Sequence, residues 1–279
     1  MNDRQPDNLT LLYDTFSKDM IDSILPGDVF EVDGIEFVCK YSPESTSERF
    51  FIVKSQKLVD CYRALCEQFH GGAIFELGIA EGGSTALMAL LAEPRKLIAV
   101  DLEPSPLSAL AEFLERRGLT DRVRPHYGVD QADRRALVDI ARADLAGDSL
   151  DLVVDDASHM LPQTRASFDA VFPFLRPGGL YVIEDWNHDH VMRDAVVKAM
   201  GNPDHTGDEE WREAFRQAAA ERTGPPEPPP RPLYPLAVEL MLARASLGDA
   251  IASVRVDEFW ITVERGPAEL DPETFALLE

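Results

Sequence analysis

The amino-acid sequence predicts an α/β protein built on a doubly wound, mostly parallel sheet of seven strands, one of them antiparallel. Three observations predict this fold. Between residues 55 and 186, short apolar segments alternate with segments whose apolar residues recur at helical spacing. Glycines follow the first apolar segment, as at a turn from a strand into a helix. Two further apolar segments meet at Asp257-Glu258 near the C-terminus, which adds an antiparallel hairpin.

Each element has its own sequence signal. Five short apolar segments bounded by Gly, Asp or Pro predict parallel strands: 73–79, 96–102, 123–130, 150–158 and 180–186. The segments with helical periodicity predict the crossover helices: 57–69, 85–93, 106–118, 133–144 and 163–175. Gly118 closes the third of these helices, and Pro177-Gly178-Gly179 stops the fifth. A further helix is expected over 236–246, before the hairpin.

The chain divides into three expected zones. Residues 1–54 form an N-terminal cap that contains a β-hairpin, because Asp33-Gly34 lies between two alternating apolar runs. This cap could be a flap packed on the core or a lid over a substrate site. Residues 55–265 form the main domain, in which 187–235 are an insertion ending in a Pro-rich loop that can be neither regular helix nor central strand. Residues 266–279 form a C-terminal tail.

The overall charge is strongly negative, with 27 Lys and Arg against 50 Asp and Glu and a formal net charge of −23. Such a chain is unsuited to binding nucleic acid or an anionic membrane surface. Its N-terminus lacks the apolar core of a signal peptide, and the three cysteines indicate neither a disulfide framework nor a zinc site. We therefore expect a cytoplasmic protein whose carboxylates are mostly solvated, with a few that hold a cation.

The glycine-rich turn after the first strand predicts a nucleoside site. Glu76 and Gly78 come at the end of that strand, and Gly82, Gly83 and Ser84 open the next helix. Asp101 ends the second strand, 23 residues after Gly78, where an acid can accept the hydroxyl groups of a ribose. The glycine spacing differs from that of dinucleotide-binding turns, so a nucleoside without phosphates fits better. A purely structural turn is the alternative interpretation.

Three carboxylates follow the fourth and fifth strands, Asp156 after one and Glu184 with Asp185 after the other. If these strands are neighbours, the three side chains converge. Carboxylates at such short distances repel one another unless they are protonated or bind a cation. Oxygen ligands of this kind predict Mg²⁺. The alternative is a helix-capping Asp with solvated acids beside it. His159 lies three residues after Asp156 and can take a proton from an alcohol.

Taken together, these segments resemble the class I S-adenosylmethionine-dependent methyltransferases, which have a Rossmann-like sheet. The similarity lies in FELGIAEGGS, AVDLEP, HYGVDQAD, DLVVDDASH, LRPGGLYVIEDW and the terminal hairpin. The resemblance implies S-adenosylmethionine as cofactor. It implies the following cofactor-binding residues: Glu76, Gly78, Gly82 and Ser84 at the methionine part, Asp101 at the ribose, Asp130 and Gln131 at the adenine edge, and Asp155.

Within that class, the DDASH and GGLYVIEDW segments resemble the metal-dependent O-methyltransferases of macrolide sugars and saccharides, and the cephalosporin hydroxylase-like family. The resemblance implies Asp156, Glu184 and Asp185 as Mg²⁺ ligands and His159 as the base. It also implies a hydroxyl of a small-molecule or oligosaccharide acceptor as methyl acceptor, and a homodimer or higher homo-oligomer. Two alternatives stay open, a catechol-type or other small-molecule O-methyltransferase and a non-catalytic binding protein on the same fold. His188 and His190 are expected to be substrate-loop residues or secondary ligands.

Overall fold

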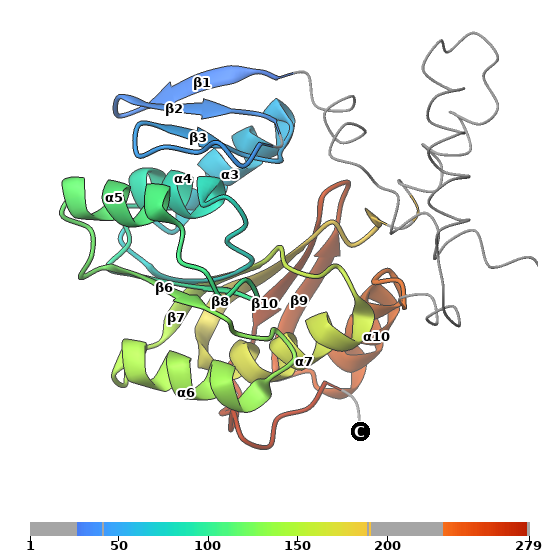
Figure 1. The fold of residues 1–279 in the computed structure, drawn as a ribbon. Coiled ribbons are helices and arrows are strands. Elements are labelled where there is room, and N and C mark those ends of the chain that lie inside the picture. Colours follow the sequence, from blue (N-terminus) through green and yellow to red (C-terminus); the bar gives the residue numbers. More distant parts are fainter. Residues whose placement is uncertain (1–26, 41, 189, 191–230, 278–279) are drawn as a thin grey trace, which may run out of the picture.

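The computed structural model describes residues 27–40, 42–188, 190 and 231–277 (Figure 1). Predictions for residues 1–26, for Tyr41 and for most of the insertion at 187–235 therefore lie outside the described residues. Within the described part of the chain, the helices are all too short or too polar to cross a membrane.

A seven-stranded sheet forms the centre of the molecule, in the order β6-β5-β4-β7-β8-β10-β9. Its strands are β4 (Ala73–Leu77), β5 (Lys96–Asp101), β6 (Val123–Tyr127), β7 (Leu150–Asp155), β8 (Leu175–Glu184), β9 (Ile251–Val256) and β10 (Trp260–Arg265). Strands β4 to β8 pair in parallel, and β10 is antiparallel to both β8 and β9. The predicted doubly wound sheet with one antiparallel strand is confirmed.

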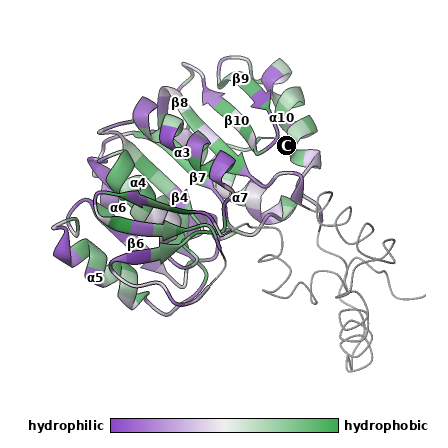
Figure 2. Cartoon of the chain, turned by 90° about the horizontal axis from the view of Figure 1, so that it is seen from above, coloured by the Kyte–Doolittle hydropathy of each residue, from purple (hydrophilic) through white to green (hydrophobic). Residues whose placement is uncertain are grey.

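Helices cover both faces of this sheet (Figure 1). Helices α3 (Gln56–Gln68), α4 (Gly83–Leu91) and α5 (Ser108–Arg116) contribute to one buried apolar cluster. Helices α6 (Arg134–Leu145), α7 (Leu161–Val171) and α10 (Pro235–Ser246) contribute to a second cluster on the opposite face. Figure 2 shows the central strands as mostly hydrophobic between these two layers, as expected for parallel strands buried on both faces.

A small second sheet comprises β1 (Val29–Val32), β2 (Ile35–Val38) and β3 (Arg49–Phe51). The predicted hairpin is confirmed, since β1 and β2 pair antiparallel around Asp33-Gly34. Phe37 stacks on Phe50, and Phe50 meets Phe113 of α5 edge-on with ring centroids 5.4 Å apart. The described part of the cap therefore shares its apolar core with α3, α4 and α5.

One predicted boundary is wrong. The expected helix 163–175 ends at Val171, a single 3-10 turn covers Phe172–Phe174, and β8 already begins at Leu175. Pro177, Gly178 and Gly179 thus lie within the strand, where the pairing with β7 shifts register. Gly179 fits there because a Cβ atom would come 3.0 Å from the carbonyl oxygen of Asp151. The Pro-Gly-Gly pattern marks an irregular strand start as well as a helix end.

Candidate active site at the carboxyl ends of the strands

The glycine-rich turn lies against the loop that follows β7. Gly78 has φ of +95°, and a Cβ atom there would come 2.2 Å from the carbonyl oxygen of Asp156. Gly82 has φ of +82° and precedes the first residue of α4. At Gly83 a Cβ atom would come 2.3 Å from the carbonyl oxygen of Phe51 in the cap. These glycines let the backbone of β4, the β7 loop and the cap meet at one point.

Glu76 is buried beneath this turn and is hydrogen-bonded within the protein. The Ser84 hydroxyl donates to its Oε1 over 2.5 Å, and the Thr85 hydroxyl donates to its Oε2 over 2.6 Å. Burial raises the pKa of the Glu76 carboxyl to about 7, although these two hydrogen bonds lower it. The structure therefore brings the predicted residues Glu76 and Ser84 together, bonded to each other.

Asp101 holds the glycine-rich turn in place. Its Oδ2 accepts hydrogen bonds from the backbone N–H groups of Ile79 and Ala80, over 2.7 and 2.9 Å. Its Oδ1 accepts from the N–H of Glu103 over 2.8 Å. The carboxylate thus links the ends of β4 and β5, and its predicted contact with a ribose stays a prediction.

A cavity of about 340 Å³ opens at these strand ends. Residues from four strand ends line it, among them Gly78, Asp101, Gln131 and Asp156. This volume is within the range of small-molecule sites, roughly 300–1,000 Å³. Asp130 also lines it, is exposed, and accepts a hydrogen bond from the N–H of Ala132 over 2.8 Å. Of the predicted cofactor-binding residues, Gly78, Asp101, Asp130 and Gln131 therefore border one cavity of suitable size.

Asp155 lies below that cavity in a buried polar network. Its Oδ1 accepts a hydrogen bond from the Gln131 amide over 2.7 Å, and its Oδ2 accepts from the Ser167 and Tyr181 hydroxyls. The Gln131 Oε1 in turn accepts from the N–H of Ser158 over 3.2 Å. Burial raises the pKa of the Asp155 carboxyl to about 6, against the hydrogen bonds from Ser167 and Tyr181. Asp155 and Gln131 thus fix the loop after β7.

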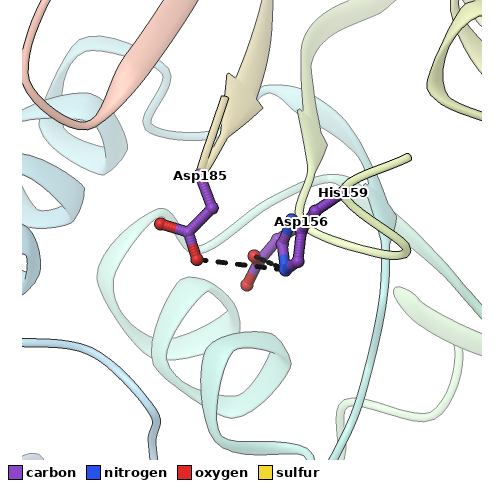
Figure 3. Close-up of side chains that lie close together, drawn as sticks. All are labelled: Asp156, His159 and Asp185. Carbon is purple, nitrogen blue, oxygen red and sulfur yellow. Dashed lines mark ion pairs between the residues drawn. The ribbon is translucent and has the colours of Figure 1, made fainter. Parts of the chain in front are cut away.

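Among the described residues, Asp156, His159 and Asp185 form a cluster that could hold a metal ion, because each offers one candidate ligand atom and these atoms lie within 4.8 Å of one another. Figure 3 shows Asp185 reaching from the end of β8 toward the His159 ring, with Asp156 beside that ring. The His159 Nε2 atom lies 3.8 Å from Asp156 Oδ1 and 3.9 Å from Asp185 Oδ2. Both His159 and Asp185 have positive φ, of 54° and 52°. Such backbone strain at non-glycine residues is concentrated at functional sites.

Glu184 faces a different set of partners. It is 1% exposed, and its Oε1 forms a short ion pair with Lys54. Its Oε2 accepts from the Tyr62 hydroxyl over 2.8 Å and from the Trp260 indole over 3.3 Å. The structure thus places Asp156 and Asp185 beside His159, whereas Glu184, which was expected to converge with these two carboxylates, points into this buried pocket. Its predicted role as a metal ligand stays a prediction.

Sequence reasoning missed Lys54, Tyr62 and Trp260. Lys54 lies between β3 and α3, and its Nζ donates to Asp156 Oδ2 over 2.8 Å as well as to Glu184. Burial alone lowers the pKa of Lys54, but Asp156 and Glu184 outweigh it and raise the pKa above its usual value. The available signal was a single lysine directly after the apolar run Phe50–Val53.

The remaining predicted residues lie at the edge of the site. His188 stacks on His159 with ring centroids 5.1 Å apart, and burial lowers the pKa of His188 to about 4. His190 is exposed. Trp186 donates from its indole nitrogen to the carbonyl oxygen of Asp257 over 2.9 Å. His188 is therefore placed to orient His159.

Comparisons with known proteins agree with this geometry. Residues 75–186 match the family model described as a methyltransferase domain. Mycinamicin VI 2''-O-methyltransferase of Micromonospora griseorubida is 50% identical over 64 residues, 23% of this chain and 15% of the relative. The 8-demethyl-8-alpha-L-rhamnosyl tetracenomycin-C 2'-O-methyltransferase of Streptomyces olivaceus is 46% identical over 56 residues, 20% of this chain and 14% of the relative.

Solved structures were compared as well. The MycE methyltransferase from the mycinamycin biosynthetic pathway, in complex with Mg and SAH, aligns with a TM-score of 0.46 and 23% identity. That alignment covers 76% of this chain and 49% of the other. The chain thus matches short stretches of its curated relatives and about half of this solved chain. Residues 75–186 thus resemble a methyltransferase domain, and they lie in a seven-stranded sheet of strand order β6-β5-β4-β7-β8-β10-β9.

Proposed function

We propose that this protein is an S-adenosylmethionine- and Mg²⁺-dependent O-methyltransferase acting on a hydroxyl of a sugar or saccharide. The observation that carries the proposal is the position of Asp156. It lies beside Asp185 and His159 in the cluster that could hold a metal ion, and it also lines the 340 Å³ cavity beside Gly78 and Asp101. A metal and a nucleoside cofactor bound at these places would therefore be neighbours. The names of these relatives, which include 2''-O- and 2'-O-methyltransferases and a rhamnosyl acceptor, support the same reaction class.

The donor atoms fit the two groups. Asp156 and Asp185 offer carboxylate oxygens, the ligands that Mg²⁺ prefers, with room for acceptor hydroxyls in its open positions. Gly78 has no side chain that would block the end of β4, and Asp101 and Gln131 offer polar atoms at the cavity wall. When bound, S-adenosylmethionine supplies an activated methyl group and Mg²⁺ makes an acceptor hydroxyl easier to deprotonate.

The chain's own residues orient the acceptor and remove its proton. Bound beside Gly78 and Asp101, S-adenosylmethionine would supply the methyl group to the acceptor oxygen, and its sulfur would keep the electron pair of the carbon–sulfur bond. His159 Nε2 takes the hydroxyl proton. Stacking with His188 and the strained backbone at residue 159 fix the orientation of the imidazole. Holding both reactants in line supplies roughly 7–11 kcal/mol of barrier reduction when the geometry is well matched.

The cap contributes to the acceptor side of this site. A smaller cavity of about 50 Å³ is lined by Val53 and Lys54 from the cap side, by Ser84 of α4 and by Asp156 of the loop after β7. We propose that residues 1–54 are a cap over the acceptor, residues 55–265 the catalytic domain and residues 266–279 a tail. A small-molecule or oligosaccharide acceptor and a homodimer or higher homo-oligomer belong to the same proposal.

Calorimetric titration and a methyl-transfer assay test the proposal. S-adenosylmethionine should bind the full chain, and a panel of deoxysugar glycosides should accept methyl groups only in the presence of Mg²⁺. Asp185→Asn should abolish the Mg²⁺-dependent methyl transfer, whereas Asp139→Asn, on the exposed side of α6, should leave it unchanged. Full activity in EDTA would contradict the metal role.

The same experiments separate the alternatives. A non-catalytic binding protein on this fold predicts no binding of S-adenosylmethionine. A catechol-type enzyme predicts transfer to aromatic diols in place of sugars. Such acceptors need aromatic stacking residues, and among the described ones Phe30 stacks on Phe37 and the Trp186 indole is bonded to Asp257. The transfer assay with aromatic diols therefore decides between the two acceptor classes.

A further inference from the structure

Gln163 has an amide oxygen without a hydrogen-bond partner in the described part of the chain. Its Oε1 atom is buried and unpaired, although the residue itself lines the 340 Å³ cavity. Buried polar atoms in folded proteins nearly always have a partner, because an unpaired one loses its bonds to water without a replacement. The terminal torsion of glutamine is soft, so the amide can turn its oxygen toward a molecule bound in the cavity.

The position of Gln163 on α7 places it at the cavity end of that helix. Helix α7 begins at Leu161, directly after the loop that carries Asp156 and His159. Residues four apart share one face of a helix, and their side chains lean toward the helix N-terminus. Gln163 comes four residues before Ser167, so it lies on the same face as Ser167 and one turn closer to the strand ends.

The donors around Ser167 are already used within the protein. The Ser167 hydroxyl donates to Asp155 Oδ2 over 2.7 Å. The Gln131 amide nitrogen donates to Asp155 Oδ1 over 2.7 Å and to Ser167 Oγ over 3.2 Å. This polar network is directed inward, toward the end of β7. A donor for Gln163 Oε1 is therefore expected from the cavity side and not from the network below it.

The wall around Gln163 suits a flat, mostly apolar ring. The following apolar side chains line the cavity: Leu77, Val100, Leu102, Val129, Ala157 and Met160. Leu102 is 69% exposed, so its side chain is free to cover a ring placed there. In an adenine that is joined to ribose, the ring nitrogens only accept hydrogen bonds, and the 6-amino group is the donor. A glutamine oxygen at this wall therefore matches that amino group.

We propose that Gln163 recognises the base of the cofactor, its Oε1 accepting a hydrogen bond from the 6-amino group of adenine. This inference rests on the proposed function, because it takes S-adenosylmethionine as the molecule in the cavity. It adds Gln163 to Asp130 and Gln131, the residues predicted at the adenine edge. Its task is selection: a base that lacks an amino group at this position leaves the oxygen of Gln163 unpaired.

Calorimetric titration of the full chain with two ligands tests this assignment. One ligand is S-adenosylhomocysteine, and the other is its analogue with hydrogen in place of the 6-amino group. Gln163→Met removes the acceptor and keeps a side chain of similar length. It should bind S-adenosylhomocysteine about five- to tenfold more weakly than wild type, the range for one hydrogen bond between neutral groups. The analogue should bind both proteins within about twofold.

Equal weakening of both ligands in Gln163→Met would show that the side chain only shapes the cavity, or that it accepts from a ribose hydroxyl or a water molecule. That result would overturn the proposal, and so would an unchanged affinity for S-adenosylhomocysteine. Gln163→Glu keeps the question open to test even if Gln163→Met fails to fold. Its carboxylate is a stronger acceptor, so the preference for S-adenosylhomocysteine over the analogue should rise by about threefold or more. An unchanged preference would contradict the proposal.

Gln56→Met is the matched control. Gln56 lies on α3, outside the residues that line the cavity, and its amide donates to Asp60 over 3.2 Å. Both ligands should bind this variant as they bind wild type. Thermal unfolding and the affinity for Mn²⁺, a paramagnetic probe that replaces Mg²⁺, should stay near wild type in all three variants.

The same titrations separate this inference from the proposed function. If wild type binds neither ligand, the proposed cofactor is wrong and the inference fails with it. If S-adenosylhomocysteine binds wild type and Gln163→Met equally well, the proposed function stands and the role of Gln163 alone is refuted.

Discussion

Gly78 and Asp156 are in backbone contact across the sheet: a Cβ atom at residue 78 would lie 2.2 Å from the carbonyl oxygen of Asp156. The end of β4 is thereby tied to the loop that carries Asp156 and His159. The cofactor half and the metal half of the site consequently share one rigid backbone junction, and several predictions depend on this junction or on the groups around it.

Gly78→Ala should damage both halves of the site. The added methyl group must displace the Asp156 backbone, and the φ of +95° is unfavourable for alanine. We expect a loss of roughly 2–4 kcal/mol in the free energy of unfolding and weaker binding of both S-adenosylmethionine and Mn²⁺. Gly118→Ala is the control, because Gly118 also has positive φ but has open space around it. It should cost only about 1–2 kcal/mol and leave both affinities intact.

Asp101→Ala should loosen the glycine-rich turn. The variant leaves the N–H groups of Ile79 and Ala80 without their carboxylate acceptor. We expect the affinity for S-adenosylmethionine, measured by calorimetry, to fall by about tenfold or more, since hydrogen bonds to charged groups contribute about 1.5–3 kcal/mol. Mn²⁺ binding should stay near the wild-type value. Equal loss of both affinities would indicate a general folding defect.

His159→Ala should separate catalysis from binding. Loss of a general base lowers the rate of methyl transfer by roughly 10²–10⁴-fold. S-adenosylmethionine and Mn²⁺ affinities should stay within a few-fold of wild type, which two titrations would show. A large loss of Mn²⁺ affinity would instead identify His159 as a ligand. His70→Ala, at an exposed histidine that faces Glu93, provides the control.

Glu76 should make the protein less stable as the pH rises. Its pKa is raised from 4.5 to about 7 in the folded state, mainly by burial. Between these values the folded state binds more protons than the unfolded state, so the free energy of unfolding falls with increasing pH. The effect is on the order of 3 kcal/mol at pH 7 and above. Asp155, whose pKa is raised to about 6, acts in the same direction.

Glu76→Gln tests this directly by urea unfolding at several pH values. The variant should flatten the decline in the free energy of unfolding between about pH 4.5 and 7, because glutamine does not titrate. Its carbonyl oxygen still accepts a hydrogen bond from a neighbouring hydroxyl. A pH dependence identical to that of wild type would contradict the raised pKa.

Phe50→Ala should lower the stability of the cap and of the main domain together. Phe50 is fully buried and contacts both Phe37 and Phe113. Truncation of a buried phenylalanine costs about 3–5 kcal/mol. A single unfolding transition with a lower midpoint is expected, because both parts share one core. Two separate transitions would show that the cap unfolds independently.

Much of the fold follows from local patterns. The alternation of apolar segments with helical periodicity placed β4 to β7 and their helices, and Asp33-Gly34 marked the hairpin of the cap. The exception is the segment from Phe172 to Gly179. Its proline and glycines lie in the irregular start of β8, but the same residues are also typical of a helix end, so the local sequence does not distinguish the two. Strand-end positions predicted that Asp156, Glu184 and Asp185 would converge, because the carboxyl ends of parallel strands lie at one edge. Asp156 and Asp185 do lie close together, beside His159, while Glu184 pairs with Lys54.

By itself, the sequence determined the class of the fold and the edge of the sheet at which the polar residues gather, since both depend on periodicity and on chain order. The tertiary structure decided how those residues share their partners. Lys54 meets Glu184 and Asp156 only when the cap packs on the sheet, across more than a hundred residues of chain. Which carboxylate faces an ammonium and which faces the cavity depends on that packing, and no local pattern in the sequence encodes it.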